Sequence, residues 1–115
     1  MDRPSSVLAQ LMGVIEDRKI NPPPRSYTTT LFQGGTAKIG KKILEEAQEV
    51  VEAADEPGEE GRQHLIYEAG DVLYHLLVLL AYRDVRLEEV ERELARRFGV
   101  SGLDEKDARG QNATS

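Results

Sequence analysis

The chain lacks cysteine entirely, although it has 115 residues, enough for one domain with one core. The absence of thiols excludes structural disulfides and any zinc site built on thiolates. It also fits a protein of a reducing compartment.

Aromatic residues and positive charge are also scarce. There is no tryptophan, and aromatic residues make up 5% of the sequence, which leaves little material for stacking on single-stranded bases. The formal net charge is -6, from 21 acidic and 15 basic residues, and an acidic surface argues against binding to long nucleic acid. A single phosphorylated small molecule is still an acceptable ligand, because local basic groups or metal ions can reverse the local field.

Long hydrophobic runs are missing as well. The N-terminus lacks the apolar core of a signal peptide. The longest apolar stretch, Val72 to Tyr82, is interrupted by His75 and is shorter than a bilayer-spanning helix. The sequence therefore predicts a cytoplasmic protein that does not enter membranes.

What the sequence does contain is helical periodicity. Apolar spacing and start and stop signals predict an all-α bundle of four to five helices within residues 1–99, followed by a flexible polar tail at 100–115. The helices are expected at about residues 5–19, 36–54, 60–82 and 87–98, with a short helical turn at 26–32 that Gly34 and Gly35 end. The segment Val72–Tyr82 is apolar on nearly every face, so we expect a homodimer that covers it; a monomeric bundle is the alternative.

Two carboxylates on the predicted helix 36–54 draw attention first. Glu46 and Glu49 are three residues apart and project from the same side, with Glu46 at the edge of an apolar arc. Taken alone, the pair is better explained as a solvated face on which glutamates pair with Lys41 and Lys42. The first pair is therefore ambiguous.

A second carboxylate pair on the next predicted helix favours a metal site over a solvated face. Glu68 and Asp71 are again three apart, directly before the most apolar stretch, and His75 lies on the same side. If the two helices pack antiparallel, four carboxylates meet, and such a cluster needs a cation. Mg²⁺ fits oxygen ligands and phosphate substrates best, with Mn²⁺ as an expected substitute. A di-iron bundle is the rival, but it requires a Glu-x-x-His motif that this chain lacks.

These motifs resemble those of the phosphoribosyl-ATP pyrophosphohydrolase family, within the all-α nucleoside triphosphate pyrophosphohydrolases. The resemblance extends from about Ser26 to Phe98. Its motifs are Ser26-Tyr27-Thr28, Lys42-x-x-Glu45-Glu46-Ala47-x-Glu49, and Glu68-x-x-Asp71-x-x-Tyr74-His75 followed by an apolar run. The carboxylate spacing is typical of the superfamily, while the Ser-Tyr-Thr segment and the run after Asp71 point to this family. The chain lacks the cysteines and the length for the cyclohydrolase fused to some relatives, so it resembles the stand-alone form.

The resemblance implies an enzyme that hydrolyses phosphoribosyl-ATP to phosphoribosyl-AMP and pyrophosphate, the second step of histidine biosynthesis, as a homodimer. It implies Mg²⁺ ligation by four residues: Glu46, Glu49, Glu68 and Asp71. Glu45 or Glu49 is expected to accept a proton from the attacking water.

The other candidate site residues are those expected to hold the substrate. Phosphate binding is expected from Lys38, Lys42 and Arg97, and further substrate contacts from Ser26, Tyr27 and Thr28. The alternatives are surface ion pairs for the two lysines, a favourable helix-end charge for Arg97, and a helix cap with a packed tyrosine for the Ser-Tyr-Thr segment. Tyr74 and His75 are expected beside the ligands, in core or dimer contacts, where His75 could orient a carboxylate.

Two other functions stay open from the sequence. One is a house-cleaning nucleoside triphosphate pyrophosphatase with the same metal chemistry. The other is a helical dimer without enzymatic activity that serves as an interaction module, for which no binding of divalent cations is expected.

Overall fold

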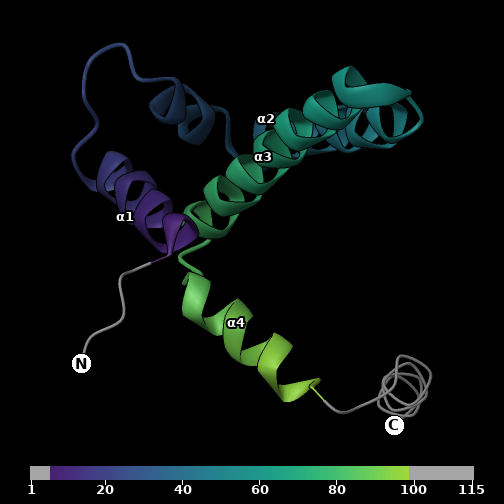
Figure 1. Cartoon of the computed structure of the whole chain (residues 1–115). Helices are drawn as coiled ribbons and strands as arrows, with labels where there is room; N and C mark the ends of the chain where they lie inside the picture. The colour runs from purple at the N-terminus through teal and green to yellow at the C-terminus, as the bar shows by residue number, and fades with distance from the viewer. Residues whose placement is uncertain (1–5, 99–115) are drawn as a thin grey trace, which may run out of the picture. The chain divides into compact units, whose positions relative to one another are not determined.

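The computed structural model describes residues 6–98, and all regular structure in this range is helical (Figure 1). The helices are α1 (Val7–Ile20), α2 (Tyr27–Ala54), α3 (Gly58–Tyr82) and α4 (Leu87–Arg96). The all-α prediction is thus confirmed. The predicted tail at 100–115 lies outside the described residues, so the boundary near residue 99 stays a prediction. The chain divides into two units, one that ends at Val85 with α1 to α3 and one that begins at Arg86 with α4.

Helix α1 begins where the sequence predicts. The Ser6 hydroxyl accepts a hydrogen bond of 3.1 Å from the backbone N–H of Ala9, and Met12 and Ile15 are buried. At its other end, Lys19 Nζ donates to the carbonyl oxygens of Ala81 and Tyr82 at 2.9 and 3.2 Å. Lysine thus satisfies carbonyls at the end of α3, where helices lack internal partners.

Helix α2 consists of two helical segments that meet at a sharp kink. Gly35, at the kink, has φ 65° and ψ −161°, outside the helical region. A Cβ built on Gly35 would lie 2.9 Å from the Tyr82 hydroxyl. The predicted helical turn at 26–32 and helix at 36–54 are thus confirmed as the two segments of α2, and glycine is needed at the kink for both conformation and space.

Helices α2 and α3 are joined by a short turn and lie side by side, with the most extensive packing in the chain (Figure 1). The buried stripe of α2 includes Ile39, Glu46 and Ala53. Leu44 and Val51, on the same predicted apolar arc, are 74% and 63% exposed. Glu46 lies at the edge of the arc as predicted, but it is buried and not partly exposed, because the buried stripe of α2 follows that edge.

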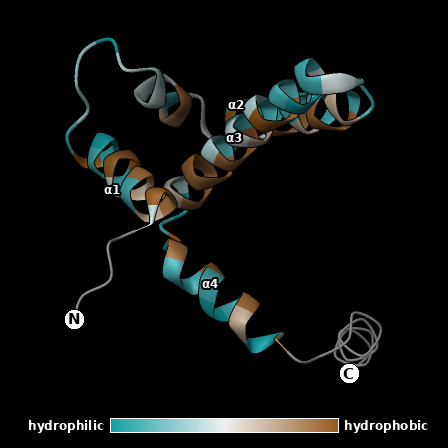
Figure 2. Ribbon diagram, in the orientation of Figure 1, coloured by the Kyte–Doolittle hydropathy of each residue, from teal (hydrophilic) through white to brown (hydrophobic). Residues whose placement is uncertain are grey.

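Helix α3 is the most apolar element, and its second half is almost continuously hydrophobic (Figure 2). Its buried side chains include Leu77, Val78 and Ala81, but Leu73 and Leu76 keep two-fifths of their surface exposed. In the described part of the chain, α3 alone is long and apolar enough to cross a membrane, by length and composition only. Core helices of soluble proteins pass the same test.

Helix α4 is short and strongly two-sided. The carboxylate of Glu89 accepts a hydrogen bond of 2.9 Å from the backbone N–H of Arg86, which caps the first turn. Leu87 is buried and Leu94 is half exposed. Helix formation at 87–98 was thus predicted correctly, and the helix ends two residues earlier, at Arg96.

Candidate functional site

Three carboxylates meet where α2 and α3 face each other. Glu46 of α2 and Glu68 and Asp71 of α3 each place an oxygen within 4.8 Å of the others. Glu46 and Glu68 are only 5% and 6% exposed, and Asp71 is half-buried. Carboxylates this close and this buried repel one another strongly unless protons or a cation lie between them.

Two buried oxygens of this cluster have no hydrogen-bond donor among the described residues. They are Oε1 of Glu46 and Oε2 of Glu68. His75 Nδ1 lies 2.6 Å from the Glu46 oxygen, but its hydrogen-bond geometry favours the backbone oxygen of Asp71, at 2.9 Å. The imidazole therefore contacts Glu46 without satisfying it, and both orphaned oxygens remain available to a cation.

The ionisation of the cluster reflects this crowding. Burial raises the pKa of Glu46 to about 7, helped by a hydrogen bond and the negative charge of Asp71. A hydrogen bond with Glu49, and then burial, raise the pKa of Glu68. Burial lowers the pKa of His75. The surroundings thus favour the protonated forms of Glu46 and Glu68 and the neutral form of the His75 imidazole.

Of the other two carboxylates predicted for the site, Glu49 is linked to the cluster, whereas Glu45 pairs with Lys42. Glu49 is exposed at the rim of the cluster and reaches it by sharing a hydrogen bond with Glu68. Glu45 is exposed and lies 3.5 Å from Lys42 Nζ. Lys42 is also close enough to Tyr27 and Glu46 for their charges to raise its pKa. Lys42 is therefore the predicted cation that lies nearest the cluster, within the part of the chain that the structure describes.

The Ser-Tyr-Thr segment begins helix α2, in agreement with the predicted helical turn at 26–32 and with the helix cap considered for this segment. Ser26 is the cap, and its hydroxyl accepts a hydrogen bond of 3.2 Å from the N–H of Thr29. The Tyr27 hydroxyl lies 3.0 Å from His75 Nε2, and the Thr28 hydroxyl bonds the hydroxyl of Tyr74. Since His75 Nδ1 donates to a carbonyl, Nε2 accepts from Tyr27. The segment thus connects the start of α2 to the residues beside the carboxylates.

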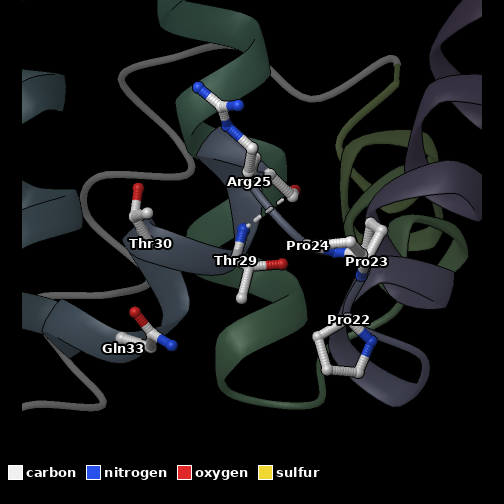
Figure 3. Close-up of a pocket in the computed structure, with 8 residues that line it drawn as sticks. Pro22, Pro23, Pro24, Arg25, Thr29, Thr30 and Gln33 are labelled. Carbon is white, nitrogen blue, oxygen red and sulfur yellow. Dashed lines mark hydrogen bonds between the residues drawn. The ribbon is translucent and has the colours of Figure 1, made fainter.

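A cavity of about 390 Å³ opens at the same end of α2 (Figure 3). Its lining residues are Pro22, Pro23, Pro24, Arg25, Ser26, Thr29, Thr30 and Gln33. In Figure 3 the prolines lie on one side, with Thr30 and Gln33 on the other. The Thr29 hydroxyl is buried there without a hydrogen-bond partner among the described groups.

Two predicted substrate residues are not brought to the cluster by any contact of the described chain. Lys38 is exposed and packs beside Gly34, whose added Cβ would lie 2.5 Å from the Lys38 side chain. Arg97 follows α4 in the second unit, and its Nε donates to Glu93 at 2.8 Å. Their roles stay predictions.

The sequence interpretation missed one residue that contacts the cluster, His64, and the residue that holds it, Glu56. His64 Nε2 lies 3.4 Å from Glu68 Oε1, and His64 Nδ1 lies 2.9 Å from Glu56 Oε2. The signal was present, since His64 and Glu68 are four residues apart on one helix face. Glu56 could not be found by spacing, because it lies in the turn between helices.

The chemistry of this donor set fits a hard divalent cation. Carboxylate oxygens are what Mg²⁺ and Mn²⁺ prefer, and the two buried oxygens that accept no hydrogen bond from the described residues could serve as ligands. The acidic cluster is therefore compatible with the predicted Mg²⁺.

Fold and site together define a class: an all-α protein that gathers carboxylates from two neighbouring helices. Comparison with known proteins is more specific. The family model described as phosphoribosyl-ATP pyrophosphohydrolase matches residues 8–98. The chain belongs to this family, as its motifs predicted.

Individual relatives carry the same name. A phosphoribosyl-ATP pyrophosphatase of Rhodopirellula baltica is 57% identical over 102 residues, which cover 89% of this chain and 85% of the relative. Those of Rhodobacter capsulatus and Geotalea daltonii are 49% and 47% identical, over 91% and 90% of this chain and 99% and 94% of theirs. These names confirm the predicted class of enzyme, a hydrolase of histidine biosynthesis.

Proposed function

We propose that this chain hydrolyses phosphoribosyl-ATP to phosphoribosyl-AMP and pyrophosphate with the help of Mg²⁺. The observation that carries the proposal is the cluster of Glu46, Glu68 and Asp71, two of whose buried oxygens accept no hydrogen bond from the described residues. Such an arrangement is costly in a merely structural helix pair and useful for holding a cation beside phosphates. The family match supplies the identity of the substrate.

In this proposal Glu46, Glu68 and Asp71 hold the cation, and Glu49 completes the set from the rim. When bound, Mg²⁺ neutralises phosphate charge and lowers the pKa of a coordinated water. Glu49, at the rim of the cluster, or Glu45, which pairs with Lys42, accepts the proton of the attacking water; both carboxylates are exposed.

Substrate phosphates are expected beside Lys42, which is half-buried between Tyr27 and the carboxylates. Lys38 and Arg97 are proposed as further phosphate contacts. Ser26, Tyr27 and Thr28 are proposed to position the start of α2, because their hydroxyls are already engaged within the chain. The cavity beside Ser26, with Arg25 in its lining, has room for part of the substrate.

We also propose that the protein acts as a homodimer in the cytoplasm. Exposed apolar side chains on α2 and α3 support the dimer: Leu44, Val51, Ile66, Tyr67, Leu73 and Leu76. A second copy laid over α3 would cover the half of its apolar surface that α2 leaves open.

Substrate preference is the direct test. Steady-state pyrophosphate release is measured with phosphoribosyl-ATP, dUTP, dCTP and ATP, each across a Mg²⁺ titration and after chelation. We expect Mg²⁺-dependent turnover with clear preference for phosphoribosyl-ATP. A preference for dUTP or dCTP would instead identify a house-cleaning pyrophosphatase.

The site itself is tested by Glu49→Gln and Asp71→Asn, each of which removes one negative charge while keeping side-chain size. Both are expected to abolish Mg²⁺-dependent release with helix content unchanged by circular dichroism. The matched control is Glu52→Gln, an exposed carboxylate on α2 that bonds Gln48, and it should leave turnover intact. Full activity in either site variant would contradict the ligand assignment.

A further inference from the structure

A histidine bridges the carboxylate cluster to the turn between α2 and α3. His64 lies on α3 one helical turn before Glu68. One ring nitrogen, Nδ1, is 3.0 and 2.9 Å from the two carboxylate oxygens of Glu56. The other, Nε2, is 3.4 Å from Oε1 of Glu68. The imidazole is therefore held between an exposed acid in the turn and a buried acid of the cluster.

The anchor of this bridge is itself held in place. Glu56 belongs to the turn that precedes α3, and this turn presses against the first residues of the helix. A Cβ built on Gly61 would lie 2.2 Å from the backbone oxygen of Glu56, so the approach requires glycine. The N–H of Gly61 also donates to the carbonyl oxygen of Pro57 at 3.4 Å. The backbone that carries Glu56 is thus fixed relative to the helix that carries His64.

Because His64 contacts only one oxygen of Glu68, the two oxygens of this carboxylate have different surroundings. Oε1 faces the imidazole, whereas Oε2 is buried and has no hydrogen-bond partner in the described chain. A glutamate has three side-chain torsions, and fixing it for a ligand costs rotamer entropy. Contact with a ring that is already held at its far nitrogen restricts those torsions before a ligand arrives. Carboxylates that bind metals are commonly held in this way by a further hydrogen-bonding group.

We propose that His64, held by Glu56 from the α2–α3 turn, positions the carboxylate of Glu68 so that Oε2 is presented to a divalent cation. This inference rests on the proposed metal site at Glu46, Glu68 and Asp71. His64 is a positioning residue: it touches a ligand and neither the cation nor the substrate. Surface ion pairs contribute little to folding, so the effect of the bridge is expected on metal affinity and not on stability.

The test is calorimetric titration of Mn²⁺ into the full chain, without substrate and at one fixed pH. His64→Leu is expected to weaken Mn²⁺ binding by about tenfold or more, the usual effect of removing a group that orients a ligand. His64→Gln keeps a donor that can reach Glu68 and should recover most of that affinity. Thermal unfolding of the metal-free variants is measured alongside and is expected to stay close to that of the unaltered chain.

A second test removes the carboxylate of Glu56, and its control removes an exposed carboxylate of the same charge. Glu56→Ala should weaken Mn²⁺ binding, and combining it with His64→Leu should add nothing further, because both variants break one chain of contacts. Glu59→Ala removes the same charge from the first turn of α3, where Glu59 bonds Gln63, and should have little effect.

Each result decides a different claim. Unchanged affinity in His64→Leu, or equal losses in Glu56→Ala and Glu59→Ala, would overturn the positioning role while the metal site stands. Failure of the unaltered chain to bind Mn²⁺ would overturn the metal site and this inference with it.

Discussion

Replacing Glu46 with glutamine should stabilise the metal-free protein while removing its function. Glu46 is 5% exposed and faces Asp71 and Glu68, so ionising it in the folded chain is unfavourable. Its pKa is raised from 4.5 to about 7. Glutamine has nearly the same shape, carries no charge, and can donate an N–H to the carboxylate of Asp71. The substitution therefore removes repulsion without leaving a cavity.

The magnitude follows from the pKa, and its sign from proton binding. The Glu46 carboxyl holds a proton more tightly in the folded chain than in the unfolded chain. The free energy of unfolding therefore falls as pH rises from about 4.5 to about 7, and it is lowest above that range. The full pKa difference corresponds to about 3 kcal/mol, and solvent near half-buried Asp71 reduces this, so we expect a gain of about 1 to 3 kcal/mol for Glu46→Gln at pH 8.

Urea unfolding with excess chelator at pH 5 and pH 8 measures this gain. Protein concentration is held constant, because a dimer couples stability to concentration. Glu46→Gln should exceed the unaltered chain at pH 8 and match it closely at pH 5, where Glu46 is mostly protonated. Glu52→Gln, an exposed change on the same helix, should alter stability by less than about 0.5 kcal/mol at either pH. A Glu46→Gln protein less stable at pH 8, or a gain equal at both pH values, would refute the reasoning.

Three further predictions concern the fold and the assembly. Gly35→Ala should destabilise the chain by about 1 to 2 kcal/mol in urea unfolding, because Gly35 has a positive φ and lies close to Tyr82. Gly40→Ala is the control and should be neutral or stabilising, because the space around Gly40 is open. Equal effects of the two substitutions would contradict the need for glycine at the kink. Lys19→Met should cost about 1 to 2 kcal/mol by thermal or urea unfolding, since it leaves carbonyls at the end of α3 without their donor; unchanged stability would mean that water replaces the lysine. Leu76→Glu, at an apolar position two-fifths exposed, should shift sedimentation velocity from dimer to monomer, and an unchanged dimer would place the interface elsewhere.

Local signals were sufficient for the helix ends. Ser6 and Ser26 cap α1 and α2, and Pro57 and Gly58 mark the start of α3, because caps and turns depend on a few neighbouring residues. The end of the first helical segment at Gly34 and Gly35 was also predicted correctly, because glycine adopts the positive φ that breaks a helix. The direction in which the chain continues depends on packing, here of Gly35 against Tyr82.

The choice of buried face could not be predicted in the same way. The apolar arc of α2 is wider than one neighbouring helix can cover, and periodicity does not say which part the neighbour takes. Helix α3 covers the part that contains Ile39, Glu46 and Ala53, and it leaves Leu44 and Val51 exposed. The pairing of carboxylates across two helices was predictable because the antiparallel arrangement follows from a short turn.

The buried position of Glu46 makes packing and cation binding parts of one equilibrium. An acid buried in the α2–α3 contact weakens that contact whenever it is ionised and alone, and a neutral or apolar residue would pack there at lower cost. A cation that binds only the folded chain returns stability as its concentration rises, by about 2.7 kcal/mol at one hundred times its dissociation constant. That figure is of the same size as the expected cost of ionising Glu46 above pH 7. Under the proposed function, the cation that Glu46 binds offsets the cost of this buried acid to the α2–α3 contact.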